Sequence, residues 1–449
     1  NNTLIEGDLC IVGAGTAGIS IALDWMKTGK KVILLESGGF QYDPQVQSLN
    51  SGSSTGQKYY PLIATRLRYF GGTTGHWAGM CAPLDDIDFR KRSWVPHSGW
   101  PLSKQDLDRY YAKAQQSLQL GPDSYELGFW QKQNAKFRPF PLDPEVVINK
   151  VWQFTQARFN ELYKNPIIKS RNLQLITHAN VVDIRLNESL STVNHLVVKN
   201  LSGKTHRIRA KHFILACGTI QNTRLLLASN SQNPNGIGNS QDLVGRFFME
   251  HLEISSGELW LFDRLESELY DFKFGESKAR AELAISSKVQ TQEKILNGTV
   301  SLSPLSFMRE LRSPMETWQN EDPRKSAENT YQPMARARSK ALKQKGLIEK
   351  AYDLHTRMEQ APNPNSRITL SNEKDLLGVP KVHLHWELSD LDKHSIRGLS
   401  QLIGKEFGKS GIGRVKIHPF LRDENDQTFP EETAGGWHHM GTLRMDNSP

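Results

Sequence analysis

The sequence predicts an α/β protein in which a Rossmann-like domain with a parallel sheet is joined to a second, α+β domain. The first observation is a glycine-rich turn at residues 13–18, which lies between an apolar run and a segment with helical spacing of apolar residues. The second is a further apolar run that ends in the carboxylate Glu36, as in a nucleotide-binding unit. The third is the alternating polarity of residues 252–310, which indicates an antiparallel sheet in the second domain.

The glycine-rich turn has the spacing Gly-x-Gly-x-x-Gly of a dinucleotide-binding fingerprint. Gly13 permits the tight turn, Gly15 lets the backbone approach a pyrophosphate, and Gly18 lets the following helix pack close to the strand. Thr16 and Ala17 lie at the start of that helix, where free N–H groups and the helix dipole favour a phosphate. These five residues form the core of the predicted cofactor site, because a strand precedes the turn and a helix follows it.

Glu36 and Ser37 extend the predicted cofactor site to the end of the second apolar run. A carboxylate at this position accepts hydrogen bonds from ribose hydroxyls, and it disfavours the 2′-phosphate of NADP. The fingerprint alone leaves FAD and NAD open as the dinucleotide.

The β-rich segments between residues 172 and 218 favour FAD. A strand, a hairpin and a strand that ends at Ala216 and Gly218 resemble the later half of FAD-binding two-domain oxidoreductases. In such proteins, the backbone at the position of Val182 approaches the adenine. We therefore expect Val182, Ala216 and Gly218 to contact the cofactor.

Hydrophobic periodicity and turn residues give the order of the other elements. Residues 50–100 are rich in Gly, Ser and Thr and are expected to form loops, which in a compact protein are usually functional. Residues 320–347 are polar and charged, and a helix is expected there. The strands are expected at residues 8–12, 31–36, 172–179, 181–187, 195–200, 206–210, 212–216 and 382–388, and the helices at 19–26, 103–120, 221–228 and 390–407.

The composition argues against several classes of protein. The 449 residues are 37% hydrophobic and 23% charged, and no run approaches the roughly 18 apolar residues of a transmembrane span. The formal net charge of +8 is dispersed and no recognition motif accompanies it, so nucleic-acid binding is not expected. Cys10, Cys81 and Cys217 form neither a disulfide framework nor a metal-ligand pattern, so no metal site is expected.

No signal peptide is visible in the sequence, which favours a cytoplasmic location. A leader removed from the N-terminus would instead favour the periplasm.

Five motifs, in order along the chain, resemble those of the glucose–methanol–choline (GMC) oxidoreductase family. Glu250 differs from the Asp that the family usually has at this position. The pair His76-Trp77 and the string PNPNSR are most similar to the bacterial sugar dehydrogenase and pyranose oxidase-like branch. The motifs are Arg68–Gly79 (RYFGGTTGHWAG), Phe213–Leu227 (FILACGTIQNTRLLL), Leu243–His251 (LVGRFFMEH), Met358–Leu370 (MEQAPNPNSRITL) and His438–Met445 (HHMGTLRM).

The resemblance implies FAD as the cofactor and identifies residues near its flavin ring. Glycines there permit close approach of the backbone, and hydroxyl groups donate hydrogen bonds to phosphate. The residues expected to line the flavin and the pyrophosphate are Gly71, Gly72, Thr73 and Thr74, and those expected to bring the backbone near the isoalloxazine are Gly441 and Thr442.

His76 matches the position at which pyranose- and choline-type members of the family attach the flavin covalently through a histidine. Two interpretations stay open for His76: a covalent bond to FAD, and a non-covalent position beside the ring, held by Trp77. A covalent bond would fix the ring and alter its redox potential.

His438 is the predicted catalytic base. Taking hydride from an alcohol requires removal of the hydroxyl proton, and a positioned histidine can accept that proton near neutral pH. The resemblance places His438 where the family keeps its flavin-facing histidine, three residues before Gly441. Gln360, Asn363 and His439 are the candidate substrate contacts, although Gln360 and Asn363 could also belong to a strand that enters the second sheet.

The implied activity is FAD-dependent oxidation of an alcohol, expected to be a sugar or polyol, by hydride transfer to flavin N5. Oxygen, a quinone or a redox protein would then accept the electrons. Two other functions stay open: a lyase of the hydroxynitrile type that holds FAD without redox turnover, and a catalytically inactive flavin-binding subunit. The resemblance also implies a second catalytic His or Asn beyond the Gly-Thr motif, for which the residues up to Pro449 offer no candidate.

The order of the motifs predicts two discontinuous domains. The FAD-binding domain is expected at residues 1–100, 171–251 and 430–449. The substrate-binding domain is expected at residues 101–170 and 252–429, with an antiparallel sheet and flanking helices.

Overall fold

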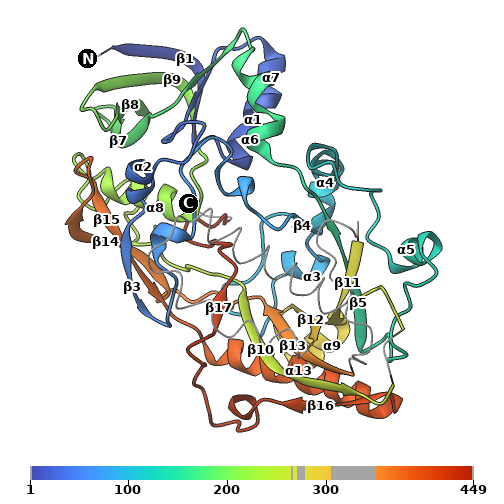
Figure 1. Ribbon diagram of the computed structural model, residues 1–449. Coiled ribbons are helices and arrows are strands. Elements are labelled where there is room, and N and C mark those ends of the chain that lie inside the picture. The colour runs from blue at the N-terminus through green and yellow to red at the C-terminus, as the bar shows by residue number, and fades with distance from the viewer. Residues whose placement is uncertain (1–2, 264–265, 271–278, 305–349, 447–449) are drawn as a thin grey trace.

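The computed structural model describes residues 3–263, 266–270, 279–304 and 350–446, and the helix expected at 320–347 lies outside these residues. An upper lobe contains β1 (Leu4–Val12), and a lower lobe contains β10 (Leu252–Leu261) and α13 (Asp390–Ser410), as Figure 1 shows. The expected combination of a parallel α/β unit and an antiparallel second sheet is confirmed.

The sheet of the upper lobe has six strands. Its first four strands in space are parallel, and the last two are antiparallel to their neighbours. Residues 205–215 form one continuous strand where the sequence predicts two, because they pair with β1 over its whole length. In spatial order the strands are β6 (Leu173–Ile176), β2 (Val32–Leu35), β1, β9 (Thr205–Leu215), β8 (Val193–Lys199) and β7 (Asn180–Leu186).

Both faces of this sheet are covered, which explains the uninterrupted apolar runs of β1 and β2. Because side chains alternate along a strand, Leu9 and Ile11 point to one face, where they pack with Ile19. Cys10 and Ile33 belong to a second cluster on the other face. The helices of this lobe are α1 (Thr16–Trp25), η1 (Met26–Thr28), α6 (Phe159–Leu162), α7 (Lys164–Ile168) and α8 (Thr219–Ala228).

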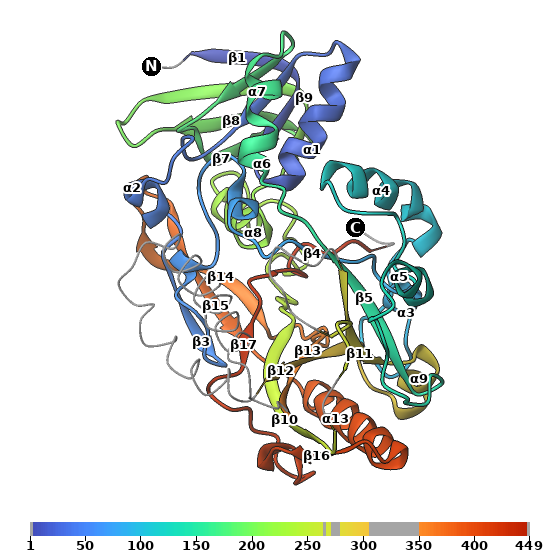
Figure 2. The same ribbon diagram turned by 45° about the vertical axis from the view of Figure 1, so that its right-hand side comes forward.

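The lower lobe is built on an antiparallel sheet, as the alternating polarity predicts. Helix α13 runs along this sheet (Figure 2) and buries Ile396, Leu399, Ile403 and Phe407 on one side. A capping box between Ser389 and Asp392 begins the helix. In spatial order the strands are β16 (Gly413–Ile417), β10, β13 (Ala351–Met358), β12 (Gly298–Pro304), β11 (Ala279–Ile285), β5 (Val147–Phe154) and β4 (Met80–Cys81), with β17 (Ala434–Gly435) paired to β10.

A third sheet joins distant parts of the chain. It consists of β14 (Arg367–Lys374), β15 (Pro380–Trp386) and β3 (Gly52–Gly56), and β3 lies parallel to β15. A segment from the expected FAD-binding domain thus pairs with one from the expected substrate-binding domain. Trp386 is fully buried where β15 ends, and its ring centroid lies 5.1 Å from that of Tyr59.

Short helices fill the connections between the sheets. Helix α4 begins after Ser103, which forms a capping box with Asp106, so the helix start predicted at Ser103 agrees with the structure. The remaining helices are α2 (Pro44–Ser48), α3 (Asp86–Phe89), α4 (Lys104–Ser117), α5 (Leu127–Gln133), α9 (Ser287–Glu293), η2 (Leu62–Ala64), η3 (Gly72–Gly75) and η4 (Pro419–Leu421).

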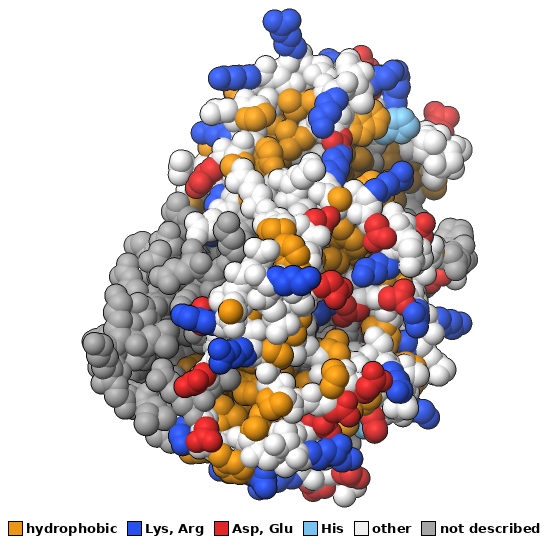
Figure 3. Space-filling view, turned by 90° about the vertical axis from the view of Figure 1, so that its right-hand side faces the viewer, with side chains coloured by type: hydrophobic (Ala, Val, Ile, Leu, Met, Phe, Trp, Pro, Cys, Tyr) orange, Lys and Arg blue, Asp and Glu red, His pale blue; other side chains and the backbone are white. Residues whose placement is uncertain are grey.

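Within the described ranges, no helix combines the length and the apolar character that crossing a bilayer requires. On the face drawn in Figure 3, Lys and Arg side chains are interspersed with Asp and Glu side chains. The positive charge of the chain is therefore not gathered into one basic surface on that face.

We expect Leu354→Ala to lower the free energy of unfolding by about 2–5 kcal/mol, because Leu354 is fully buried in the core of the lower lobe and the change leaves a cavity. Leu376→Ala is the matched control, since the Leu376 side chain is 67% exposed. Urea unfolding followed by circular dichroism measures both changes. Equal midpoints for the two variants would contradict the assigned core.

Candidate functional site

The turn between β1 and α1 has the geometry that the fingerprint predicts. Gly13 has a φ of +101°, and a Cβ there would lie 2.6 Å from the carbonyl oxygen of Ala216. A Cβ at Gly18 would collide with the carbonyl oxygen of Gly13, so only glycine lets α1 pack this close to the turn. A Cβ at Gly15 would meet open space. Gly15 therefore leaves room for a ligand, whereas Gly13 and Gly18 leave room for the protein's own backbone.

Glu36 closes the carboxyl end of β2 and supports the same turn. Its carboxylate accepts hydrogen bonds from the amides of Ala14 and Gly38, each at 2.9 Å. Burial raises the pKa of Glu36, and the two amides oppose that rise. Each oxygen of an ionised carboxylate has a further acceptor site, so Glu36 can also accept a hydroxyl hydrogen from a ligand.

A cleft of about 350 Å³ lies beside this turn. Six predicted cofactor residues are not among those that line it. Gly18 packs under the turn, Gly71 donates its amide to the Ala14 oxygen at 2.8 Å, and Val181 rather than Val182 lines the cleft. The other three are His76, Gly441 and Thr442. The predicted cofactor residues that do line the cleft are Gly13, Gly15, Thr16, Ala17, Glu36, Ser37, Gly72, Thr73, Thr74, Ala216 and Gly218.

Two partly buried arginines, which sequence reasoning did not assign to the site, also line the cleft. Arg68 donates to the Ser37 hydroxyl and to the Asn50 side chain, both at 2.7 Å. Burial lowers the pKa of Arg66 to about 9 and that of Arg68 to about 10, so both stay charged at neutral pH. The two guanidinium groups give the cleft a positive charge that favours phosphate. The signal was present in the sequence, because Arg68 opens the first motif and Arg66 stands two residues before it.

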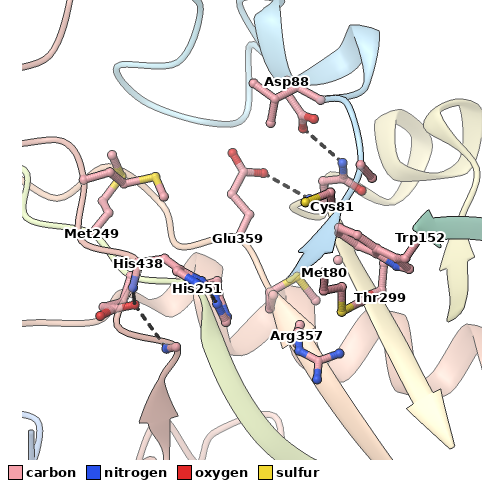
Figure 4. A pocket seen from close by; sticks show the side chains of 18 of the residues that line it. Met80, Cys81, Asp88, Trp152, Met249, His251, Thr299, Arg357, Glu359 and His438 are labelled. Carbon is pink, nitrogen blue, oxygen red and sulfur yellow. Dashed lines mark hydrogen bonds between the residues drawn. The ribbon is translucent and has the colours of Figure 1, made fainter. Parts of the chain in front are cut away.

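A larger cavity of about 1410 Å³ opens beside the cleft and extends over the antiparallel sheet. Thr73, Trp437 and His438 belong to the walls of both spaces, so the cleft and the cavity meet there. Figure 4 shows His438 and His251 side by side in the cavity wall, with Glu359 and Asp88 above them in this view. A ligand that begins at the glycine-rich turn can therefore reach the histidines.

His438 opens onto this cavity and is held from two sides. Its Nδ1 lies 2.6 Å from Nε2 of His251, and its backbone amide donates to Glu250 at 3.0 Å. The surrounding cavity walls partly desolvate the ring, which lowers the pKa of His438. The imidazole is therefore neutral at pH 7 and can accept a proton.

Glu250 anchors the segment that carries both predicted histidines. One carboxylate oxygen accepts the amides of Gly436 and His438, and the other accepts the Tyr59 hydroxyl at 2.5 Å. Burial raises the pKa of Glu250 to about 7. Nε2 of His439 lies 2.8 Å from the Tyr59 oxygen, and this ring lines the cleft rather than the large cavity.

The predicted substrate contacts Gln360 and Asn363 make internal hydrogen bonds. The Gln360 oxygen accepts the Glu250 amide and the Trp386 indole N–H, both at 3.0 Å, and its amide group donates to the Glu387 carbonyl. Gln360 still forms part of the cavity wall, whereas Asn363 lines neither space and donates to the Glu387 carboxylate.

His76 and Gly441 line the large cavity. His76 makes an edge contact with Tyr69, with ring centroids 5.9 Å apart. Thr442 lines neither space, because its hydroxyl is buried at 2.7 Å from that of Thr223. Of the predicted pair after His438, the structure thus brings only Gly441 to the cavity.

Comparisons with known proteins place the chain among FAD-dependent oxidoreductases. A sequence profile of the FAD-dependent oxidoreductase family matches residues 8–234. The chain is 23% identical to the fructose dehydrogenase large subunit of Gluconobacter japonicus, over 95% of this chain and 88% of that protein. It is 23% identical to 2-methyl-1,2-propanediol dehydrogenase of Mycolicibacterium austroafricanum, over 99% of this chain and 86% of that protein. Pyridoxine 4-oxidase of Mesorbium loti has the same fold, with a TM-score of 0.54 and 14% identity over 98% of this chain and 89% of that one.

The residues present fit FAD. Open space at Gly15, the charge of Arg66 and Arg68, and the free N–H groups at the start of α1 suit a pyrophosphate. Glu36 suits the ribose hydroxyls. The larger cavity leaves room for a flavin ring beside His438.

We expect Gly15→Ala to weaken FAD binding while the FAD-free protein keeps its stability, because the new methyl group meets no protein atom but enters the cleft. Gly18→Ala should destabilise the FAD-free protein as well, because of the collision with the Gly13 oxygen. FAD titration and thermal unfolding measure the two effects. Gly408→Ala, at an open helical position in α13, is the control. Unchanged FAD affinity in Gly15→Ala would contradict the position of the pyrophosphate.

Proposed function

The chain belongs to the FAD-dependent oxidoreductase family, and we propose that it is a GMC-type enzyme that oxidises an alcohol group of a sugar or polyol. The main support is the position of His438 where the cofactor cleft meets the large cavity. The ordered GMC motifs support the same proposal. So do two relatives whose names describe dehydrogenases of fructose and of a diol.

FAD, when bound, supplies the hydride acceptor. The protein's own task is to remove the hydroxyl proton, because an alkoxide donates hydride far better than an alcohol does. His438 performs this step as general base, since its lowered pKa keeps the imidazole unprotonated at neutral pH. Glu250 holds the backbone of His438 in place through the amide hydrogen bond.

The far side of the cavity is suited to a polyhydroxylated substrate. Arg92 pairs with Glu359 at 2.8 Å, and the Asn297 side chain donates to Asp88 at 3.0 Å. All four side chains line the cavity, and they offer both donors and acceptors to sugar hydroxyl groups. We assign recognition of the substrate to this wall, to which the proposed substrate-binding domain of residues 101–170 and 252–429 contributes Asn297 and Glu359, and the proposed FAD-binding domain contributes Asp88 and Arg92.

The proposed electron acceptor is oxygen, a quinone or a redox protein. The proposed FAD-binding domain comprises residues 1–100, 171–251 and 430–449, and the positions of His438 and His76 give it both the base and the candidate attachment point.

We expect anaerobic addition of the oxidisable alcohol, found in a panel of sugars and polyols, to bleach the flavin absorbance. His438→Ala should slow this reduction about 10²–10⁴-fold, because the hydroxyl proton then has no base. In the parent, the rate should fall as the pH drops through the pKa of His438, which lies below the ordinary value of about 6.5. Stopped-flow absorbance measures each rate.

His394→Ala on α13 is the control for this experiment, because His394 contacts the Glu293 carbonyl on the surface. A flavin that stays oxidised with every alcohol, while a cyanohydrin is cleaved, would replace the proposal with a lyase. Equal reduction rates in His438→Ala and the parent would remove His438 from the mechanism.

For His76, we propose covalent attachment of FAD, supported by its place in the cavity wall. Acid precipitation of the holoprotein should leave the yellow colour with the pellet, and His76→Ala should release it to the supernatant. The absorbance of the two fractions measures the result. Colour in the supernatant of the parent would mean that FAD is bound non-covalently.

A further inference from the structure

His251 contacts the predicted base directly, although no sequence motif assigns it a role in the reaction. It stands immediately before β10, and its ring centroid lies 4.7 Å from that of His438. The 2.6 Å separation of His251 Nε2 and His438 Nδ1 means that the two rings share one hydrogen between these atoms. A Cβ at Gly436 would collide with His251 Nε2, so the C-terminal segment needs glycine there to admit the ring.

A partly buried charge lies behind His251. Glu253 places a carboxylate oxygen 3.8 Å from His251 Nδ1. Burial raises the pKa of Glu253, but Arg357 at 3.0 Å and His355 at 3.6 Å outweigh it and hold that pKa well below its usual value. Glu253 is therefore ionised at neutral pH, and its negative charge faces His251.

Glu253 and Arg357 belong to a row of side chains with alternating charges across the antiparallel sheet. Arg357 also contacts Glu282 at 2.6 Å, and Glu282 contacts Arg280 at 2.6 Å. The groups that face His251 are Glu253 from β10, Arg357 and His355 from β13, and His438 from the C-terminal segment. Burial lowers the pKa of His251 to about 4, with Arg357, His355 and His438 acting in the same direction and Glu253 against it. A neutral His251 carries one ring hydrogen, on either Nδ1 or Nε2. The position of that hydrogen decides whether Nε2 of His251 can accept a hydrogen bond from His438.

We infer that His251 is a positioning residue that transmits the charge of Glu253 to His438 and fixes the tautomer of the base. The carboxylate favours the hydrogen on Nδ1 of His251, so Nε2 of His251 carries a lone pair. That lone pair accepts the Nδ1 hydrogen of His438. Nε2 of His438 is then left with the lone pair that a general base requires.

This inference rests on the proposed alcohol oxidation. There, the O–H bond of the substrate would break as an N–H bond forms at Nε2 of His438. The C–H bond of the same carbon would break with its electron pair as the C=O bond forms, and bound FAD would supply the hydride acceptor. No proton needs to pass along the chain. Glu253 stabilises the positive charge that develops on His438, and His251 holds the ring at the required angle.

The first test does not depend on turnover. In holoprotein labelled with ¹⁵N-histidine, the ring nitrogen shifts should show His438 with its hydrogen on Nδ1 above its pKa. Glu253→Gln should give a mixture of the two tautomers, because the charge is lost and the shape is kept. Glu258→Gln is the matched control, since Glu258 lies on the same strand and its side chain contacts Trp260. An unchanged His438 tautomer in Glu253→Gln would overturn the inference.

The second test uses the pH profile of flavin reduction. Glu253→Gln should move the acid limb of kcat/KM to lower pH, because the charge of Glu253 raises the pKa of His438 in the parent. A purely structural role would lower the rate without moving that limb.

His251→Leu should lower kcat on the order of 10- to 100-fold with little change in KM. His251→Gln should recover part of the loss, because its amide oxygen can accept the His438 hydrogen.

The two proposals fail in different ways. If none of the alcohols tested reduces the flavin of the parent protein, the proposed function fails. The tautomer measurement still decides the role of His251 in that case. If the parent is active and depends on His438, but His251→Leu retains the parental kcat and pH profile, the inference fails alone. His394→Leu is the control for His251→Leu, and retention of FAD shows that each variant is folded.

Discussion

The buried carboxylate of Glu250 holds the reactive end of this protein in place, and the arrangement of the site depends on it. Four groups gather around its two oxygens: the amides of Gly436 and His438, the Tyr59 hydroxyl and the His439 ring. Burial brings its pKa to about 7, so it is only partly ionised at neutral pH. Loss of this acceptor would leave buried donors unpaired and would release the segment that carries His438.

The same segment is joined to the nucleotide-binding sheet. The Thr219 hydroxyl, at the start of α8, donates to the His439 carbonyl at 2.7 Å, and Thr223 meets Thr442 at the same distance. Helix α8 follows β9, the strand that pairs with β1 beside the glycine-rich turn. One continuous set of contacts therefore fixes the distance between the phosphate end of the cleft and the histidines, although their residues lie at opposite ends of the chain.

Local features of the site could be predicted from the sequence, because the residues of the turn and Glu36 act through their spacing along the chain. The contacts of His438 could not, since His251, Glu250 and Tyr59 come from distant segments that only the tertiary fold brings together. Val181 lines the cleft, whereas the approach of the Val182 backbone to the adenine stays a prediction. The internal hydrogen bonds of Gln360 were equally invisible, because they depend on Trp386 and on the backbone of Glu250.

Occupation of both spaces by one dinucleotide is the claim on which the account rests. A crystal structure of the protein with FAD bound would test it most directly. We predict the ribose of the adenosine beside Glu36, the pyrophosphate at Gly15, and the isoalloxazine in contact with the His438 ring. An FAD molecule whose flavin ring lies away from His438, outside the large cavity, would contradict the account.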